Sequence, residues 1–297
     1  MKVIKFIIMF YGKDEKLMQN KREIVVTIAQ FDVKMFNRDY NLKRMKKLME
    51  EAKEKYNPDI IVFPECANCG YNFCNVDEVE RVAEPIDGVT IEYMKKLSLE
   101  MEIALIFGIV EKDKENYYNT AVLIEKSGRV QSYRKTHLPY MGVDRYVKKG
   151  DKIGFFESEF GLIGIMICYD LRFPEVAREL ALRGANIVFL TTDLPKGGEV
   201  HPEVFSRARA CENRIFVVTS NRIGQERGFH YIGRSQIINP MGEILLEMGE
   251  NEGIAAQKID LNLAEKKDIV VIPGEYETRL YKDRRPELYE TLNVAIE

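Results

Sequence analysis

The chain has 297 residues, of which 45% are hydrophobic and 31% are charged, and its formal net charge is −3 at pH 7. This length suits one large α/β domain or two small ones, and the near balance of 44 basic and 47 acidic residues gives no support to a nucleic-acid partner or an anionic membrane surface. Five cysteines in so long a chain argue against a disulfide framework, so we expect a reducing, cytoplasmic setting.

Residues 1–22 are predicted to be an N-terminal extension outside the core. Their apolar stretch at 3–11 contains Lys5, is far shorter than a membrane span and lacks the small-residue cleavage site of a signal peptide. A flexible arm, an added edge strand and a true start at Met18 are all compatible with this segment. We expect no membrane partner.

The first half of the chain alternates apolar runs with amphipathic segments. Apolar residues at helical spacing indicate helices over 37–55 and 90–100. Short runs rich in β-branched residues indicate strands at 24–30, 59–63 and 103–110, and a strand pair at 118–125 and 129–133.

The second half continues this pattern around an apolar run at 162–167, which is followed by a helix from Pro174 to a stop at Gly184. No low-complexity linker interrupts the chain, so we predict one domain over 23–297 with a charged tail from about 268. The tail has little periodicity and is expected to run over the surface or onto a partner subunit. Further strands are predicted at 185–192, 215–220 and 254–260, a helix over 202–214, and a hairpin of 231–238 with 244–246.

Cys168 lies between the strand at 162–167 and the helix that Pro174 opens. Ligands and chemistry in α/β sheets collect at such strand ends. Most free cysteines are small buried hydrophobic residues, and position alone leaves that interpretation open for Cys168. The alternative is a nucleophile whose thiolate is favoured by nearby helix N–H groups or by a cation.

Glu65 and Lys135 also follow predicted strands. Glu65 comes after a fully apolar strand and a rigid proline, so we expect it to be partly buried with a raised pKa, as a general base requires. Acidic residues after strands are usually solvated, and so are most lysines. The catalytic interpretation of Lys135 depends on its charge, which helps to keep Glu65 ionised.

Cys66, Cys69 and Cys74 include a C-x-x-C pattern that deserves separate interpretation. A zinc site would need four ligands, and no second C-x-x-C or paired-histidine motif occurs. A thioredoxin-like motif normally opens a helix in a different context. We therefore predict no metal site and interpret these residues as loop cysteines near a pocket.

The three candidate residue types suit the cleavage of a carbon–nitrogen bond. A thiolate must attack the carbon, a base must move the thiol proton to the leaving amine, and a positive group must stabilise the oxyanion. Cys168, Glu65 and Lys135 match these roles. The backbone N–H of Tyr169 is a candidate second oxyanion donor.

Three segments closely resemble the signatures of the nitrilase, or carbon–nitrogen hydrolase, superfamily: F-P-E at 63–65, Y-R-K-T-H-L at 133–138 and I-C-Y-D-L-R-F-P-E at 167–175. The resemblance covers about 23–290 and implies a four-layer α-β-β-α sandwich with no cofactor. It also implies a triad of Glu65 as general base, Lys135 as oxyanion stabiliser and proton donor, and Cys168 as nucleophile. Family members commonly pair their sandwiches with crossing tails, so a homodimer or higher homo-oligomer is expected.

The chain departs from the family pattern at 142–151. Many members carry a further glutamate between the lysine and a P-G-D-like turn, whereas this segment reads GVDRYVKKGD and contains none. Asp144 lies one residue from the expected place. It is a candidate to substitute for the glutamate, with a shorter reach.

The predicted activity is hydrolysis of a non-peptide C–N bond in a small linear amide, through a cysteine thioester, with release of ammonia or an amine. The alternative within the family is an N-carbamoyl amide hydrolase or a nitrilase. Arg172 and Arg207 are then candidates to bind a substrate carboxylate, although structural ion pairs are the simpler role for both. The alternative of another class is a non-catalytic binding protein on the same fold.

A Cys–His pair is a rival catalytic arrangement. The chain has three histidines, His137, His201 and His230, and His137 lies two residues from Lys135. No Asn or Asp partner motif of the papain type accompanies them. We therefore interpret the histidines as pocket or surface residues.

Overall fold

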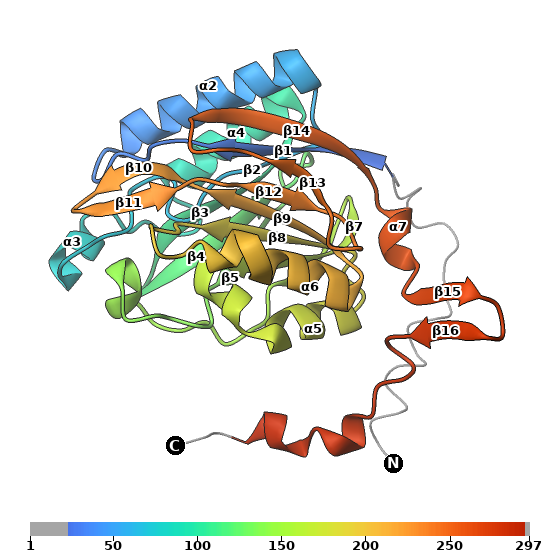
Figure 1. Cartoon of the computed structure of the whole chain (residues 1–297). Helices are drawn as coiled ribbons and strands as arrows, with labels where there is room; N and C mark the ends of the chain where they lie inside the picture. Colours follow the sequence, from blue (N-terminus) through green and yellow to red (C-terminus); the bar gives the residue numbers. More distant parts are fainter. Residues whose placement is uncertain (1–22, 295–297) are drawn as a thin grey trace.

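The computed structural model describes residues 23–294, in which two six-stranded sheets lie face to face with helices against their outer faces (Figure 1). The strand order is β14-β1-β2-β3-β4-β5 in the first sheet and β13-β12-β9-β8-β7-β6 in the second. The predicted α-β-β-α sandwich is therefore confirmed. The predicted extension, residues 1–22, lies outside the described residues.

The first sheet combines strands from the first half of the chain with one strand that returns from the end. β1, β2 and β3 are parallel neighbours, whereas β14, β4 and β5 pair antiparallel. Helices α2 (Arg38–Tyr56) and α4 (Val89–Met101) cover its outer face, and the short α3 (Val76–Glu80) lies in a loop. The strands are β1 (Glu23–Gln30), β2 (Ile60–Val62), β3 (Ala104–Asp113), β4 (Asn116–Ile124), β5 (Val130–Arg134) and β14 (Gly253–Asp260).

The second sheet has a parallel centre of β7, β8 and β9 with antiparallel strands on both sides. Helices α5 (Pro174–Leu182) and α6 (Ser206–Asn213) cover its outer face, and α7 (Asn262–Glu265) follows β14. Across residues 23–294, none of the helices has the length and apolar character needed to cross a membrane. The strands are β6 (Phe155–Ser158), β7 (Gly161–Ile167), β8 (Ile187–Thr192), β9 (Phe216–Asn221), β12 (Gln236–Ile238) and β13 (Ile244–Glu247).

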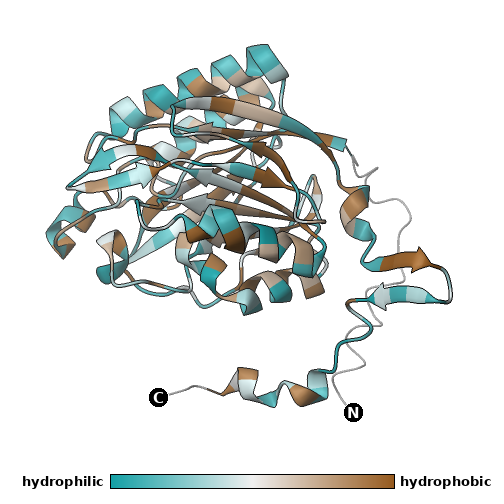
Figure 2. Cartoon of the chain, viewed as in Figure 1, coloured by the Kyte–Doolittle hydropathy of each residue, from teal (hydrophilic) through white to brown (hydrophobic). Residues whose placement is uncertain are grey.

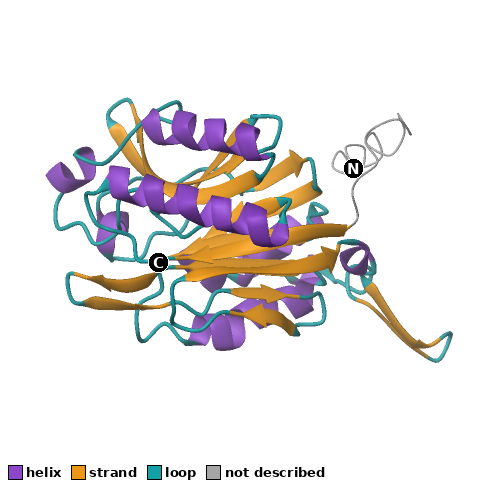
Figure 3. Ribbon diagram, turned by 90° about the horizontal axis from the view of Figure 1, so that it is seen from above, coloured by secondary structure: helices purple, strands orange, loops and turns teal. Residues whose placement is uncertain are grey.

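The apolar runs are continuous because the central strands are buried on both faces. In β7, Ile165 and Ile167 pack into the core between the sheets, and Met166 packs against the α5 and α6 side. In β2, Val62 faces the other sheet and Ile61 faces the helices. A strand between two layers has no solvent face to mark with polar residues. Figure 3, a view from above, shows helices packed over the strands.

The helix predicted over 202–214 is only partly correct. Its first part is a π-helical turn, His201–Phe205, and the α-helix α6 begins at Ser206. π-Helical turns are rare and frequently occur at functional sites.

The strand predicted over 231–238 is wrong in its first part. Residues Phe229–Ile232 form β11 and pair with β10 (Ile223–Glu226) in a separate hairpin, while β12 alone pairs with β13. Gly233 and Arg234 have φ values of 61° and 57°. A positive φ turns the chain out of the extended conformation, so these two residues end one strand before the next begins.

The tail contains more regular structure than the sequence indicated. β15 (Asp268–Ile272) and β16 (Tyr276–Arg279) form a hairpin that projects from the sandwich (Figure 1). Its first strand is strongly hydrophobic (Figure 2), and Val271 is 56% exposed. Exposed apolar strands of this kind mark interaction surfaces.

Candidate active site

Four strand ends from the two sheets meet at one buried site. Glu65 lies beyond the end of β2, and Lys135, Cys168 and Asp193 follow the last residues of β5, β7 and β8. Glu65, Lys135 and Asp193 are completely buried, and Cys168 is 7% exposed. The structure thus brings the three predicted residues to strand ends around a common centre, although they are up to about a hundred residues apart in the chain.

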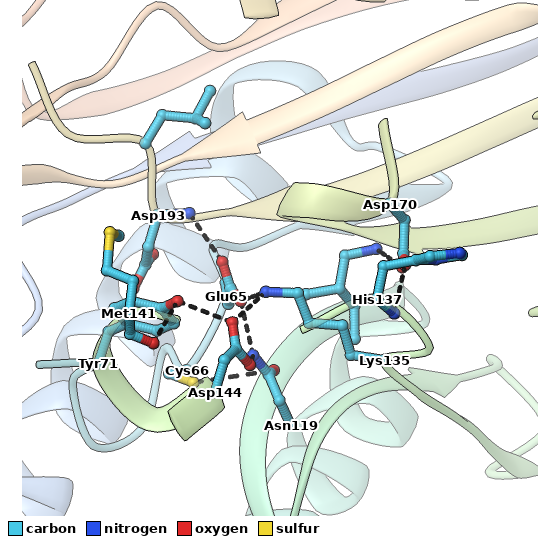
Figure 4. Close-up of polar contacts among 12 residues, drawn as sticks. Glu65, Cys66, Tyr71, Asn119, Lys135, His137, Met141, Asp144, Asp170 and Asp193 are labelled. Atoms are coloured by element: carbon cyan, nitrogen blue, oxygen red, sulfur yellow. Dashed lines mark hydrogen bonds and ion pairs between the residues drawn. The ribbon is translucent and has the colours of Figure 1, made fainter. Parts of the chain in front are cut away.

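Glu65 is held by three hydrogen-bond donors. Its Oε1 accepts from Lys135 Nζ at 2.7 Å and from Asn119 Nδ2 at 2.6 Å, and its Oε2 accepts from the Asp193 backbone N–H at 3.1 Å (Figure 4). The loop after β2 lies so close to β3 that a Cβ on Gly108 would collide with the Glu65 backbone. Glycine at 108 therefore allows the close approach that positions Glu65.

Asp144 is the second carboxylate on Lys135. Its Oδ2 lies 2.6 Å from Lys135 Nζ and accepts from the Tyr71 hydroxyl at 2.7 Å, while its Oδ1 accepts from Asn119 Nδ2 at 2.9 Å (Figure 4). Asp144 belongs to the 3-10 helix Gly142–Arg145. It therefore contacts the lysine directly, and Asn119 bridges the two carboxylates.

Burial and charge act together on the proton affinities of this cluster. Burial raises the pKa of Glu65, and although Lys135 opposes this, Asp144 adds to it, so the net direction is upward. Burial lowers the pKa of Lys135, but Asp144 and Glu65 outweigh this and raise it well above its usual value. Two carboxylates surround one ammonium group, so the cluster favours a charged lysine and a readily protonated Glu65. This agrees with the raised pKa predicted for Glu65.

Cys168 occupies a strained position at the start of the 3-10 helix Cys168–Arg172, with a φ of 42°. This left-handed conformation is unfavourable for a non-glycine residue, and such strain clusters at functional sites. Burial raises the pKa of the Cys168 thiol, the charge of Glu65 raises it further, and Lys135 and the Asp193 backbone N–H lower it. The resting side chain is therefore a thiol, which needs a base to remove its proton.

Asp170, in the same 3-10 helix as Cys168, hydrogen bonds to the segment that carries Lys135. Its Oδ2 accepts from the Ile167 N–H at 2.9 Å and the Tyr133 hydroxyl at 2.8 Å. Its Oδ1 accepts from the His137 N–H at 3.2 Å and the Thr136 hydroxyl at 3.2 Å. Since Lys135 lies between Tyr133 and Thr136, this buried carboxylate links the positions of lysine and cysteine.

Sequence reasoning missed Asn119, Asp170 and Asp193 as parts of the site. Asp170 lies within the C-Y-D motif, which was a usable signal. Asn119 is a polar residue within the predicted strand at 118–125, and a single polar residue in a strand is too common to indicate a role. Asp193 directly follows a buried strand, as Cys168 does, and the same reasoning could have found it.

The predicted role of Tyr169 as an oxyanion donor stays a prediction. Tyr169 follows Cys168 in the same 3-10 helix, and its ring makes an edge contact with Phe173 at 5.2 Å.

The C-x-x-C cysteines lie at different depths around the site. Cys66 and Cys69 are buried and Cys74 is exposed, and all three are free thiols. In the described part of the chain they do not join a group of three or more residues that could hold a metal ion. Cys66 Sγ lies 3.9 Å from Asn119 Oδ1, so its surroundings are those of a packing residue next to Glu65.

His137 and His201 use their Nδ1 atoms for contacts other than Cys168. His137 Nδ1 lies 2.8 Å from Asp170 Oδ1, and the ring stacks on Phe173. His201 is buried, with Nδ1 3.0 Å from the Gly198 carbonyl. Within residues 23–294, no histidine hydrogen bonds to Cys168, so the Cys–His alternative finds no support in the geometry.

The two candidate arginines do not form the ion pairs that we considered the simpler explanation. Arg207 Nε donates to the Gly242 carbonyl at 3.0 Å. Arg172 lies over the Phe205 ring, 5.5 Å from its centre. Among the described residues, neither guanidinium group has a carboxylate partner, because a backbone carbonyl and an aromatic ring take those places.

Comparison with known proteins gives a consistent result. The family model described as carbon-nitrogen hydrolase matches residues 25–267. A protein named nitrilase from Pyrococcus abyssi is 34% identical over 272 residues, covering 90% of this chain and 99% of that protein. A 2-oxoglutaramate amidase from Bacillus subtilis is 32% identical, covering 86% and 98%. The crystal structure of a carbon-nitrogen hydrolase from Helicobacter pylori G27 superposes with a TM-score of 0.81 at 23% identity, covering 92% and 98%.

Proposed function

The chain belongs to the carbon–nitrogen hydrolase family, and on this basis we propose that it hydrolyses a small linear amide through a thioester on Cys168. The observation that carries the proposal is the buried Glu65–Lys135 pair, at 2.7 Å, whose charges act on the Cys168 thiol. A binding protein would have no need to bury two carboxylates and an ammonium group around a strained cysteine, because such burial is costly.

The first step is attack by sulfur. Glu65 takes the proton from the Cys168 thiol as the sulfur bonds to the amide carbon, and the carbonyl oxygen becomes an oxyanion. The raised pKa of Glu65 makes it a stronger base for this transfer. Lys135 stabilises the oxyanion by its charge, and the Tyr169 N–H is the proposed second donor.

The second step is loss of the amine. The protonated Glu65 returns its proton to the leaving nitrogen, the C–N bond breaks and a thioester on Cys168 remains. Glu65 then takes a proton from the water that attacks the thioester carbon. The C–S bond breaks and Glu65 returns this proton to the sulfur, so the carboxylic acid leaves and the Cys168 thiol and the Glu65 carboxylate are restored. The ionised Lys135 serves both tetrahedral intermediates.

Asp144 is proposed to fill the place of the family's further glutamate. Its carboxylate contacts Lys135 beside Glu65, with Asn119 bridging the two carboxylates, and it keeps the ammonium group charged. The shorter side chain reaches the lysine directly because the Gly142–Arg145 helix is packed closely against Tyr71. A Cβ on Gly142 would collide with the Tyr71 ring.

An amide is favoured over a nitrile or a carbamoyl compound. Among similar proteins, one is named 2-oxoglutaramate amidase and another (R)-stereoselective amidase, although one is named nitrilase and another probable nitrilase.

Two further properties belong to the proposal. The exposed apolar strand β15 supports a homodimer or larger homo-oligomer in which the tail meets another subunit. All five cysteines are free, which supports a reducing, cytoplasmic setting.

The test is a screen for ammonia release from linear amides, N-carbamoyl compounds and nitriles. Cys168→Ala should lower the rate on every active substrate by on the order of 10⁴-fold or more. Cys211→Ala, which removes an exposed free cysteine of α6, is the matched control and should leave the rate unchanged. Carbon dioxide released together with ammonia would identify a carbamoyl substrate. Full activity of Cys168→Ala would refute the mechanism.

A further inference from the structure

Asp193 is a buried carboxyl group that the proposed mechanism does not use. It follows β8, and its side chain has the same strand parity as Ile187 and Phe189, which face the core between the sheets. It is completely buried, and neither of its side-chain oxygens has a hydrogen-bond partner. Buried polar groups are nearly always hydrogen bonded, so this exception calls for a functional explanation.

The nearest cation, Arg222, does not satisfy Asp193. The two groups are 3.7 Å apart, beyond hydrogen-bond distance. Arg222 Nη1 donates to Glu226 at 2.7 Å, Nη2 donates to the Val33 carbonyl at 2.6 Å, and Nε has no partner. The guanidinium group is therefore held by other residues at a distance where it acts on Asp193 through charge alone.

The backbone of the same residue contacts the catalytic groups. The Asp193 N–H donates to Glu65 Oε2 at 3.1 Å, and it also favours the ionised form of Cys168. Asp193 thus fixes the direction of the Glu65 carboxyl group and places its own unpartnered carboxyl group next to it.

The surrounding charges make this arrangement sensitive to a single proton. Burial raises the pKa of Asp193 well above its usual value, Arg222 opposes this, and Glu65 and Glu226 add to the rise. Four carboxyl groups, including Asp144, share two buried cations, so adding or removing one charge changes the balance at all of them. The titratable and charged groups facing this cluster are Asp32, Glu65, Cys66, Tyr71, Lys135, Asp144, Cys168, Arg222, Glu226 and Tyr231.

We propose that Asp193 is a positioning residue for Glu65: its N–H orients the catalytic carboxyl group, and its buried carboxyl group competes with Glu65 for the same protons and, once ionised, makes Glu65 bind a proton more readily. The proposal rests on the proposed role of Glu65 as the base. Asp193→Asn keeps the backbone N–H and the side-chain shape while it removes the charge. Since a neighbouring anion makes ionisation harder, its removal should let Glu65 and Cys168 ionise at lower pH.

The experiment compares the full-length wild type with Asp193→Asn and Asp193→Ser in two assays. The first is kcat/KM for an active amide as a function of pH. The second is the pH dependence of Cys168 alkylation by iodoacetamide, located by peptide mass mapping, which requires no turnover. The matched control is Glu159→Gln. Glu159 is a partly buried carboxyl group whose pKa is also raised by burial, and it precedes the first residue of β7, whereas Cys168 follows the last.

Both Asp193 variants should move the acid limb of both profiles to lower pH by about one unit, with KM unchanged. Glu159→Gln should leave both profiles in place. Profiles of folded Asp193 variants that coincide with the wild type, or an equal shift in Glu159→Gln, would overturn the proposal. If the wild type hydrolyses no amide while the alkylation profile shifts, the proposed function fails and the influence of Asp193 on the cysteine stands.

Discussion

The two sheets supply the candidate site with side chains held in opposite ways. The first sheet supplies Glu65 and Lys135, which hydrogen bonds of 2.6 to 2.7 Å join to Asn119 and Asp144. The second sheet supplies Cys168, in a strained backbone conformation, and Asp193, whose carboxylate has no hydrogen-bond partner. On the first-sheet side, the charged groups all have hydrogen-bond partners that hold them in place. The other side holds the proposed nucleophile and a carboxyl group without a hydrogen-bond partner, and both belong to the reaction that we propose.

This contrast predicts the largest effects on the first-sheet side, where removal of one charge leaves others unpaired. Lys135→Met leaves Glu65 and Asp144 buried without their cation. We expect kcat/KM to fall by on the order of 10³-fold and the free energy of unfolding to fall by about 3–5 kcal/mol. Substrate kinetics and urea unfolding measure the two effects.

The matched control is Lys126→Met. Lys126 also forms an ion pair, with Asp59 at 2.9 Å, but it is partly exposed and outside the site. It should change stability by about 1 kcal/mol or less and leave activity intact. Equal losses in the two variants would mean that the buried network has no special role.

Asp170 offers a way to break the link between the two sides. Asp170→Asn places an amide NH₂ group among donors from Ile167, Tyr133, Thr136 and His137. The mutual position of Lys135 and Cys168 should loosen, and kcat should fall by about 10²-fold, since a displacement of 1 Å can cost that much.

His137→Gln is the comparison for this variant. It removes the ring contact with Asp170 but keeps the backbone N–H bond, so its effect on kcat should be several times smaller. Steady-state kinetics of both variants decide the point. A larger loss in His137→Gln would indicate that the ring itself takes part in catalysis.

Substitution of Asp144 is expected to have the smallest effect on activity, but it tests the direction of one charge interaction on the first-sheet side. Asp144 raises the pKa of Glu65, so Asp144→Asn should lower that pKa and move the acid limb of kcat/KM to lower pH. We expect kcat to fall about tenfold, because Glu65 becomes a weaker base. Asp144→Glu keeps the charge and should keep the acid limb in place. An upward shift in Asp144→Asn would contradict the assignment of these charges.

The strand ends were predictable because their signals are local. Glu65, Lys135 and Cys168 follow β-rich segments, two of them completely apolar, and such runs indicate strands from the identities of neighbouring residues alone. The split between β11 and β12 was not predictable in this way, because Gly233 and Arg234 adopt positive φ in a segment whose composition reads as continuous strand. A positive φ at arginine depends on contacts that a local pattern does not contain.

Residue patterns alone were enough to predict the alternation of strands and helices, the three candidate side chains at strand ends and the family resemblance that assigned their roles. The packing of the two sheets brings particular groups into contact: Glu65 and Lys135 are 70 residues apart, and Asp193 reaches Glu65 across 128 residues. It also decided the direction of each pKa shift, because burial and neighbouring charge exist only once the two sheets have packed together. Residue types determine what a side chain is able to do, and packing determines the partners with which it does so.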